Sequence, residues 1–500
     1  MLALLALIPI FVVLLLMLIF RLGSHIAGLA GWAAAVLVGL LAFGLTWQVI
    51  WVSQTKGILL TLNVVYLLWP ALFLYHLVDQ AGGIRAIAQS LQRVIPDTGW
   101  LILVLAWMFT GLIENVAGFG LPITIGAPML TALGVSPVIS VASTAIGHSW
   151  SVVTSGMALA FRTLTDITGT DQAALFPPTA VLGSIAILLT GLSTAWVLKQ
   201  LKHWRKVILL ALVVSAVLAL SGLLGLITLS SFIASIVGII AGIWLGKKPD
   251  NWKPNTDKDK HLLGGVLTYG FLIAVIMAAT LIKPVNTFLS QYTWTLSFPE
   301  VATTLGHATP GGNGYLFRYL THPGTFILLT SLFALFAFPR IKGYQIGKTG
   351  VAFTRMVKSG VPASLGTLFM IGMATLMEHS GMTLRLAQGI SQLAGSVYPL
   401  FAALIGITGT FISGSNTNSN VVLGIMQRDV AGLLKLSPLV ILAAQTVGGA
   451  LGSMIAPAKL AVGTTTSAIK GSEGEILRIT LPIGLGSIAI IGVAAWLMLL

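Results

Sequence analysis

The chain alternates between long apolar stretches and short polar ones. Runs of about 20 residues rich in Leu, Ile, Val, Ala and Phe recur from one end to the other, and glycine-rich or charged segments separate them. A hydrocarbon core about 30 Å thick requires a run of this length for each helical crossing. The ten-residue alternating segments typical of membrane β-barrels do not occur. The pattern therefore predicts an all-α polytopic membrane protein.

The first apolar stretch runs from Met1 to Phe20. It has no basic segment before it, and Arg21 follows it in place of a small-residue cleavage site. A cleaved signal peptide remains the alternative, but these features favour a retained N-terminal transmembrane helix.

The distribution of charged residues predicts how the chain is oriented in the membrane. Only 8% of residues are charged, and the net charge of +14 comes from short basic clusters between apolar runs. Such clusters act as topology signals and do not indicate nucleic-acid binding. The clusters at 199–206, 247–260 and 340–358 are expected on the cytoplasmic side. Counting crossings then places 283–322 outside, as the one extended candidate for structure beyond the membrane.

An internal repeat determines the expected architecture. The six residues Leu182–Ile187 recur letter for letter as Leu485–Ile490. Other pairs at nearly the same offset are Asp79 with Glu378, Gly82 with Gly381, and Ser136-Pro137 with Ser437-Pro438. The parity of crossings makes the two halves run in opposite directions across the membrane. Inverted repeats are typical of secondary transporters, whose binding sites lie near the midplane between the halves.

The repeat divides the chain into four parts. These are an N-terminal transmembrane helix at 1–22, a first repeat at 23–200, linker helices with an outer segment at 201–322, and a second repeat at 323–500. Each repeat is expected to contain a hairpin, at about 99–134 and 398–433, and a broken helix, at about 138–162 and 437–462.

Polar runs interrupt the apolar stretches inside both hairpins. The first run is Glu114–Pro122 and the second is Ser413–Asn420, which holds three Asn in eight residues. Non-helical backbone at membrane depth survives only where it is buried in protein or lines a wet cavity. We therefore expect both runs to be tips of re-entrant hairpins, with kinked, fully spanning helix pairs as the alternative. The broken helices would add free N–H groups that suit a carboxylate.

These runs resemble the motifs of a known family. Ile113–Pro122 is similar to the Glu-Gly-x-Ala-Gly-Phe-Gly-x-Pro signature of the lactate permease family, with Asn115 in place of the Gly, and Gly414–Asn420 is similar to its Gly-Ser-Asp/Asn-Thr-x-Ser-Asn motif. Met454–Pro457 resembles a third block. The resemblance implies uptake of lactate, and often glycolate, by proton symport across a bacterial-type cytoplasmic membrane. Ser415-Asn416-Thr417 also resembles the broader ion-transporter superfamily, which implies an elevator-type fold.

Candidate site residues come from the tips and the broken helices. The expected substrate-binding residues are Asn115, Gly118, Phe119, Gly120, Ser149, Ser151, Ser415, Asn416, Thr417, Asn418, Gln445 and Lys459. Glu114 is a proton carrier or a structural cap, because an ionisable group inside a membrane is costly and functional by default. His148 is a second proton carrier or a buried imidazole bonded to backbone. Lys459 contacts the carboxylate or extends toward the cytoplasmic face.

Other functions fit the sequence less well. A membrane enzyme would require a metal or nucleophile constellation, and the eight His are scattered in a chain without Cys. A proton-translocating subunit of a larger complex would require a chain of Lys and Glu at the midplane. We expect no cofactor beyond the coupling ion, which is H⁺ or alternatively Na⁺. The expected partners are a small carboxylate and the lipid bilayer, with a monomer or a homodimer as the assembly.

The orientation yields a first prediction. A cysteine at Gly312 should react with an impermeant thiol reagent added to intact cells, whereas one at Asn255 should not, because the two segments lie on opposite sides. The chain has no native Cys to interfere. Equal labelling of both positions from outside would contradict the orientation.

Overall fold

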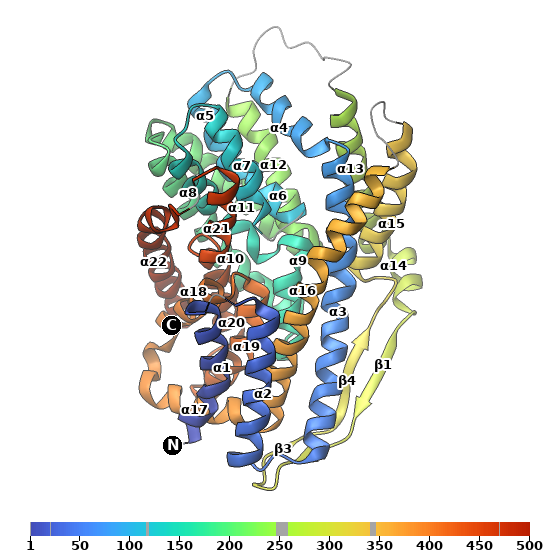
Figure 1. Cartoon of the computed structure of the whole chain (residues 1–500), viewed down its shortest axis with the longest axis vertical. Coiled ribbons are helices and arrows are strands. Elements are labelled where there is room, and N and C mark those ends of the chain that lie inside the picture. Colours follow the sequence, from blue (N-terminus) through green and yellow to red (C-terminus); the bar gives the residue numbers. More distant parts are fainter. Residues whose placement is uncertain (1, 21, 117–119, 247–258, 341–346, 470) are drawn as a thin grey trace.

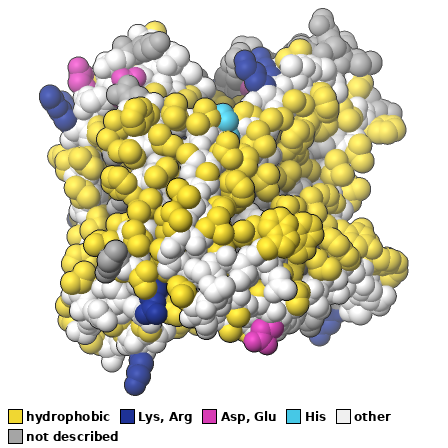
Figure 2. Space-filling view, turned by 60° about the horizontal axis from the view of Figure 1, so that its bottom comes forward, with side chains coloured by type: hydrophobic (Ala, Val, Ile, Leu, Met, Phe, Trp, Pro, Cys, Tyr) yellow, Lys and Arg dark blue, Asp and Glu magenta, His cyan; other side chains and the backbone are white. Residues whose placement is uncertain are grey.

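The computed structural model describes residues 2–20, 22–116, 120–246, 259–340, 347–469 and 471–500 (Figure 1). Gly118 and Phe119, two of the predicted site residues, lie outside these ranges. Eleven helices among the described residues are long and apolar enough to cross a membrane. Apolar side chains cover the middle of the face in Figure 2, and charged side chains lie toward its upper and lower edges. The chain is a multi-pass membrane protein.

The helices of the first half alternate between long spans and short pieces. They are α1 (Leu2–Leu18), α2 (Ser24–Ala42), α3 (Trp47–Gln80), α4 (Gly83–Val94), α5 (Thr98–Val104), the π-helical segment η1 (Leu105–Phe109), α6 (Thr110–Val116), α7 (Leu121–Ala132), α8 (Pro137–His148), the 3₁₀ segment η2 (Ser149–Val153), α9 (Ser155–Thr168) and α10 (Gln172–Val197). The middle of the chain adds η3 (Leu201–His203), α11 (Trp204–Leu223), η4 (Ile227–Leu229), α12 (Ser230–Leu245), α13 (Asp259–Leu281) and α14 (Lys283–Ser290).

The second half again combines long spans with shorter helices. Its elements are α15 (Pro323–Ala337), η5 (Phe338–Arg340), α16 (Gly347–His379), α17 (Met382–Ala394), η6 (Gly395–Val397), α18 (Tyr398–Ser413), α19 (Asn416–Leu433), α20 (Pro438–Gly452), α21 (Pro457–Thr466) and α22 (Glu473–Leu497). α16 follows α3, and α22 follows α10, at an offset of about 300 residues.

Local sequence explains where many of these helices begin. Side-chain oxygens of Thr46, Asp97 and Asp171 accept hydrogen bonds from free backbone N–H groups in the first turns of α3, α5 and α10. Pro137 and Pro438 occupy the first positions of α8 and α20, where a missing N–H costs nothing.

The expectation of an all-α chain is wrong in the outer segment. β1 (Trp294–Phe298) pairs antiparallel with β4 (Gly312–Phe317), and β2 (Val301–Ala302) pairs antiparallel with β3 (Ala308–Thr309). Outside the apolar runs nothing forces the backbone to satisfy its hydrogen bonds within one helix, so paired strands become available. In Figure 1 these strands lie beside the lower half of α3.

The two longest helices, α3 and α16, pack against each other in opposite directions (Figure 1). Near the start of α3, a Cβ on Gly57 would lie 3.2 Å from the Cα of Gly372, late in α16. Near the end of α3, the indole N–H of Trp69 donates to Ser364, nearer the middle of α16, at 2.9 Å. We call this antiparallel pair the frame.

Two further pairs of helices form hairpins. In the second, α18 and α19 run antiparallel, and Ser419 donates to the carbonyl of Gly406 at 2.8 Å while Gln427 donates to that of Ala402 at 2.9 Å. In the first, α6 and α7 face each other where Gly126 meets the methyl group of Thr110. Each hairpin packs on a broken helix, α8–η2–α9 or α20–α21.

Glycine permits that packing at matching positions. A Cβ on Gly147 of α8 would overlap the carbonyl oxygen of Ala106 in η1, and a Cβ on Gly448 of α20, 301 residues later, would overlap that of Ala403 in α18. Backbone therefore touches backbone in both halves. The π-helical turn at η1 lies at this contact, in keeping with the frequent occurrence of such turns beside functional sites.

This contact yields a stability prediction. Gly448→Ala should lower the free energy of unfolding by about 1–3 kcal/mol, because a rigid carbonyl cannot make room for the added methyl group. Gly432→Ala is the matched control, since a Cβ there meets no atom within 4 Å and alanine favours the helix. Thermal unfolding of both purified variants checks this, and equal melting temperatures would contradict it.

Candidate functional site

Helix ends from both halves meet in one place. α6 ends at Val116 and α7 begins after Gly120, whose φ of +85° suits glycine. α18 ends at Ser413, before Gly414 with its φ of +70°, and α19 begins after Ser415, whose hydroxyl accepts from the N–H of Asn418 at 3.3 Å. The N-terminus of α19 therefore presents a positive dipole end and free N–H groups to the space in front of it.

The broken helix α8–η2–α9 adds a left-handed turn. Gly156, Met157 and Ala158 have φ values of +54°, +58° and +59°. Left-handed backbone costs about 1–2 kcal/mol at each non-glycine residue, so the surrounding packing must hold it. The turn places Ser155 and Gly156 beside the hairpin tips.

A small cavity of about 90 Å³ lies between these elements. Its polar lining consists of Glu114, Ser155, Gly156, Gly414, Ser415, Asn416, Thr417 and Lys459, and its apolar lining includes Leu67, Leu68, Ala71 and Leu72 of the frame helix α3. Five of the predicted site residues, Glu114, Ser415, Asn416, Thr417 and Lys459, therefore line one cavity. Its size suits a solute of a few heavy atoms.

Three ionisable groups meet at the cavity. An oxygen of the Glu114 carboxyl lies 3.8 Å from the Lys459 Nζ, and the other lies 4.0 Å from the His148 Nε2. The Lys459 ammonium also donates to Ser453 at 3.2 Å. All three ionisable side chains are buried. A buried charge requires a partner, so the ion pair between Glu114 and Lys459 is what makes both tolerable here.

The hydrogen bond at the far side of the imidazole fixes its tautomer. His148 Nδ1 lies 2.7 Å from the carbonyl oxygen of Thr144, which only accepts, so Nδ1 carries a proton. In the neutral ring Nε2 is then an acceptor, and it faces Glu114 without another hydrogen-bond partner in the described chain. The carboxyl oxygen nearest to it is likewise without one. The arrangement can hold a proton between the two groups.

A cluster of amides supports the second hairpin tip. Asn416 donates to the carbonyl of Thr446 at 3.1 Å, and Asn420 donates to the Thr446 hydroxyl and to the carbonyl of Ala160, each at 3.0 Å. The side-chain oxygens of both Asn residues are buried and have no hydrogen-bond partner among the described residues. Asn416 also lines the cavity, but its side-chain oxygen lies against α20, where a Cβ on Gly449 would overlap it.

Other predicted site residues face elsewhere. Asn115 donates to Gly111 at 2.8 Å and to Ser235 at 3.3 Å, and accepts from Ser231 at 2.5 Å, so its amide fixes the first hairpin to α12. Gln445 donates to Ser419 at 3.1 Å and thereby joins α20 to α19.

The hydroxyls of Ser149 and Ser151 each donate, at 2.8 Å, to the backbone carbonyl three residues earlier. Gly120 lies beside the aliphatic stem of Lys459, because a Cβ there would be 3.8 Å from its Cγ. These residues do not line the cavity and pack behind the residues that do.

Asn418 lines a second, larger cavity of about 390 Å³. That cavity shares Gly414, Ser415, Thr417 and Lys459 with the first and extends to His25 on α2 and Thr367 on α16. Lys459 therefore stands between the two spaces.

Sequence reasoning did not select Asn420, Thr446, Ser155 or Ser453 as site residues. Asn420 belongs to the polar run of the second hairpin, and Ser155 and Ser453 belong to the interruptions of the broken helices, so the motifs contained them. Their individual contacts depend on the packing of helices from both halves, which no motif encodes.

A multi-pass helical protein with a buried, charged cavity between hairpin tips and broken helices is a membrane transporter. Residues 2–500 match the sequence profile of the L-lactate permease family, and the chain belongs to that family. It is 26% identical to an L-lactate permease of Streptococcus iniae, across 87% of this chain and 92% of that protein. It is 25% identical to the glycolate permease GlcA of Escherichia coli, across 98% of this chain and 94% of that protein.

A solved structure shares the fold. The YdaH transporter of Alcanivorax borkumensis superposes with a TM-score of 0.52 and 15% sequence identity, covering 89% of this chain and 87% of that one. The family and the fold together confirm a transporter and not an enzyme.

The amide at the second tip yields a prediction. Asn416→Ala should weaken substrate binding by about 1–3 kcal/mol, because it leaves the buried carbonyl of Thr446 unpaired and loosens the helix end that lines the cavity. Gln427→Ala, at a buried amide of the same hairpin that bonds Ala402 and Gln445 and does not line the cavity, is the comparison. Equilibrium binding measured on folded protein checks this. Wild-type affinity in the Asn416 variant would show that Asn416 does not contribute to substrate binding.

Proposed function

We propose that this chain carries a small 2-hydroxy monocarboxylate, lactate or glycolate, across a bacterial cytoplasmic membrane together with a proton. The names of its relatives support the substrate class. The observation that carries the proposal is the buried ion pair between Glu114 and Lys459 at a cavity sized for such an acid. A transporter for neutral solutes would have no reason to bury an ammonium beside its cavity.

The substrate carboxylate binds between Lys459 and the N-terminus of α19. The ammonium supplies charge, and the N–H groups of the first helical turn, at Asn416 and Thr417, supply hydrogen bonds aligned with the helix dipole. The 2-hydroxyl bonds to a serine hydroxyl of the cavity lining, that of Ser155 or Ser415. Leu68 and Leu72 cover the methyl group of lactate.

Protonation of Glu114 makes room for the substrate anion. With Glu114 ionised, a second carboxylate about 4 Å away is repelled by roughly 4 kcal/mol at an effective dielectric constant of about 20, which disfavours binding by roughly a thousandfold. A proton on Glu114 removes that repulsion and releases Lys459 from its ion pair. His148 then accepts the hydrogen bond of the neutral carboxyl through Nε2. Each substrate anion thus enters with one proton, and the site remains neutral.

Alternating access follows from two inverted halves with re-entrant hairpins that move against the frame in an elevator-like manner. This reading is supported by the antiparallel packing of α3 on α16 and by the matching contacts of Gly147 and Gly448. It is also supported by two ion pairs across the frame. Lys56 lies 3.7 Å from Glu378, and Arg355, 299 residues after Lys56, lies 3.7 Å from Asp79.

The coupling mechanism yields a prediction. Glu114→Gln mimics the protonated form permanently, so the variant should bind and exchange lactate between equal concentrations yet fail to accumulate it when driven by a pH gradient. Wild-type affinity should fall as pH rises, because deprotonation restores the repulsion, whereas the variant's affinity should be independent of pH. Glu300→Gln, in the exposed outer segment, is the control and should behave as the wild type.

Reconstituted proteoliposomes with an imposed pH gradient, and separately with equal lactate on both sides, provide both measurements. Accumulation by the Gln variant under a pH gradient alone would show that Glu114 is not the proton carrier, and His148 would be tested next in the same way.

A further inference from the structure

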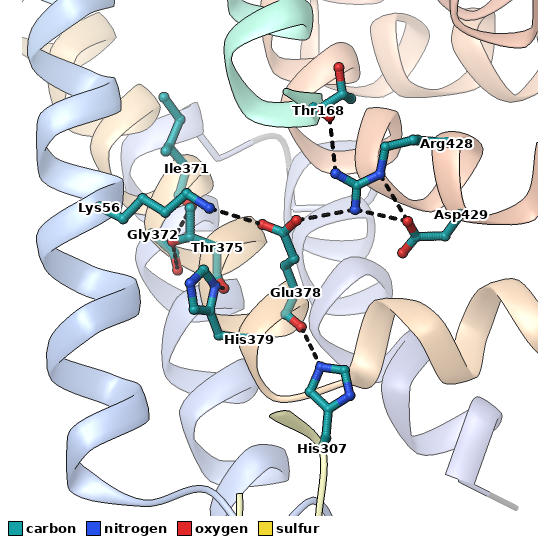
Figure 3. A network of polar contacts seen from close by, with 10 residues as sticks. All are labelled: Lys56, Thr168, His307, Ile371, Gly372, Thr375, Glu378, His379, Arg428 and Asp429. Atoms are coloured by element: carbon teal, nitrogen blue, oxygen red, sulfur yellow. Dashed lines mark hydrogen bonds and ion pairs between the residues drawn. The ribbon is translucent and has the colours of Figure 1, made fainter. Parts of the chain in front are cut away.

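Four charged side chains form a network far from the cavity (Figure 3). Glu378, near the end of α16, accepts from Arg428 of α19 at 3.1 Å and lies 3.7 Å from Lys56 of α3. The guanidinium of Arg428 also donates to Asp429 at 2.8 Å and to the carbonyl of Thr168, at the end of α9, at 3.1 Å. Arg428 therefore connects the second hairpin and α9 to the frame.

The network lies at the outer end of the frame. α16 begins beside the basic cluster at 340–358, which marks the cytoplasmic side, so Glu378 at its other end faces outside. His307, in the turn between β2 and β3 of the outer segment, contacts the backbone carbonyl of Glu378 at 3.3 Å. Along α19, Arg428 is twelve residues from Asn416, or about 18 Å from the hairpin tip.

The first hairpin carries no charge at the positions that match Arg428 and Asp429. The ion pair between Arg355 and Asp79 matches that between Lys56 and Glu378 at an offset of 299. At the same offset, however, Arg428 and Asp429 correspond to Met129 and Leu130 on α7. An ion pair between α3 and α16 thus occurs at both ends of the frame. The ion pair from a hairpin to the frame, made by Arg428, occurs at the outer end.

Each partner in this link has a second counter-ion on its own side. When α19 separates from α16, Glu378 keeps Lys56 within the frame, and Arg428 keeps Asp429 on its own helix. Breaking a partly buried ion pair is costly when it leaves a charge without a counter-ion. Here both Glu378 and Arg428 keep a counter-ion after the separation. The side chains of Glu378 and Arg428 are 19% and 29% exposed, so water reaches both on separation. This is the arrangement expected of a contact that opens and closes.

We propose that Arg428 is a positioning residue that holds the second hairpin against α16 while the outer side of the transporter is closed. Opening to the outside breaks the contact between Arg428 and Glu378, and closing restores it. The contact therefore sets the balance between the outward-open and outward-closed states without touching the substrate. This inference rests on the proposed alternating-access mechanism, in which the hairpins move against the frame.

Site-directed labelling tests the proposal. A reporter, Leu159→Cys, is placed on α9 where it lines both cavities, in a chain without native Cys. In right-side-out vesicles, Arg428→Met, which copies Met129 of the first half, should raise the rate of labelling by an impermeant thiol reagent about fivefold. Glu378→Gln should do the same, because it removes the other partner of the contact. Arg428→Lys should restore most of the wild-type rate.

Asp429→Asn is the matched control. It removes the counter-ion that Arg428 keeps on its own helix but leaves the contact with Glu378 intact, so labelling should not rise above the wild-type rate. Wild-type labelling in a folded Arg428→Met protein, or an equal increase in Asp429→Asn, would overturn the proposal. If Arg428→Met does not fold, Glu378→Gln carries the same test. The assay requires no lactate, so failure of the proposed substrate or of proton coupling would leave its result readable.

Discussion

The candidate site depends on one constraint, which is that a carboxylate and an ammonium are buried together inside a membrane protein. Neither Glu114 nor Lys459 is tolerable there alone. Their 3.8 Å contact satisfies both charges and at the same time makes each dependent on the other. In the proposed mechanism, a substrate carboxylate that binds Lys459 displaces Glu114, and Glu114 takes up a proton. Substrate recognition and proton coupling are then the same exchange of partners.

The surroundings of this pair are built to hold it. Glycine at Gly147 and Gly448 brings the broken helices into backbone contact with the hairpins, and Asn115 fixes the first hairpin to α12. The 3₁₀ segment η2 and the left-handed residues that begin at Gly156 interrupt the regular helix between α8 and the rest of α9, and Ser155 there lines the cavity. The frame, by contrast, carries matching ion pairs at its two ends, and the additional link through Arg428 distinguishes the outer end from the inner.

Much of this was predictable from the sequence. Apolar run lengths indicated a multi-pass protein, which the helices confirm, and the polar runs at the tips indicated the family, which the comparison across residues 2–500 confirms. Glu114, Asn416 and Lys459 were selected because polar groups inside apolar runs are costly and require a reason, and the structure places all three at one cavity. Asn115 and Gln445 show the limit of that argument, because a buried amide satisfies the same rule by bonding to a neighbouring helix. Which neighbour it meets depends on packing. The strands within 294–317 were not predicted, because outside the apolar runs the backbone hydrogen bonds need not be satisfied within one helix.

The measurement that tests the central claim most directly is the number of protons bound with each substrate molecule. Calorimetric titration of the wild-type protein with lactate at neutral pH, repeated in buffers of different ionisation enthalpy, reports that number. An exchange in which Glu114 is protonated as Lys459 receives the substrate predicts uptake of about one proton per lactate bound. Binding of lactate with no proton uptake, at a pH where Glu114 is ionised in the empty protein, would contradict the account.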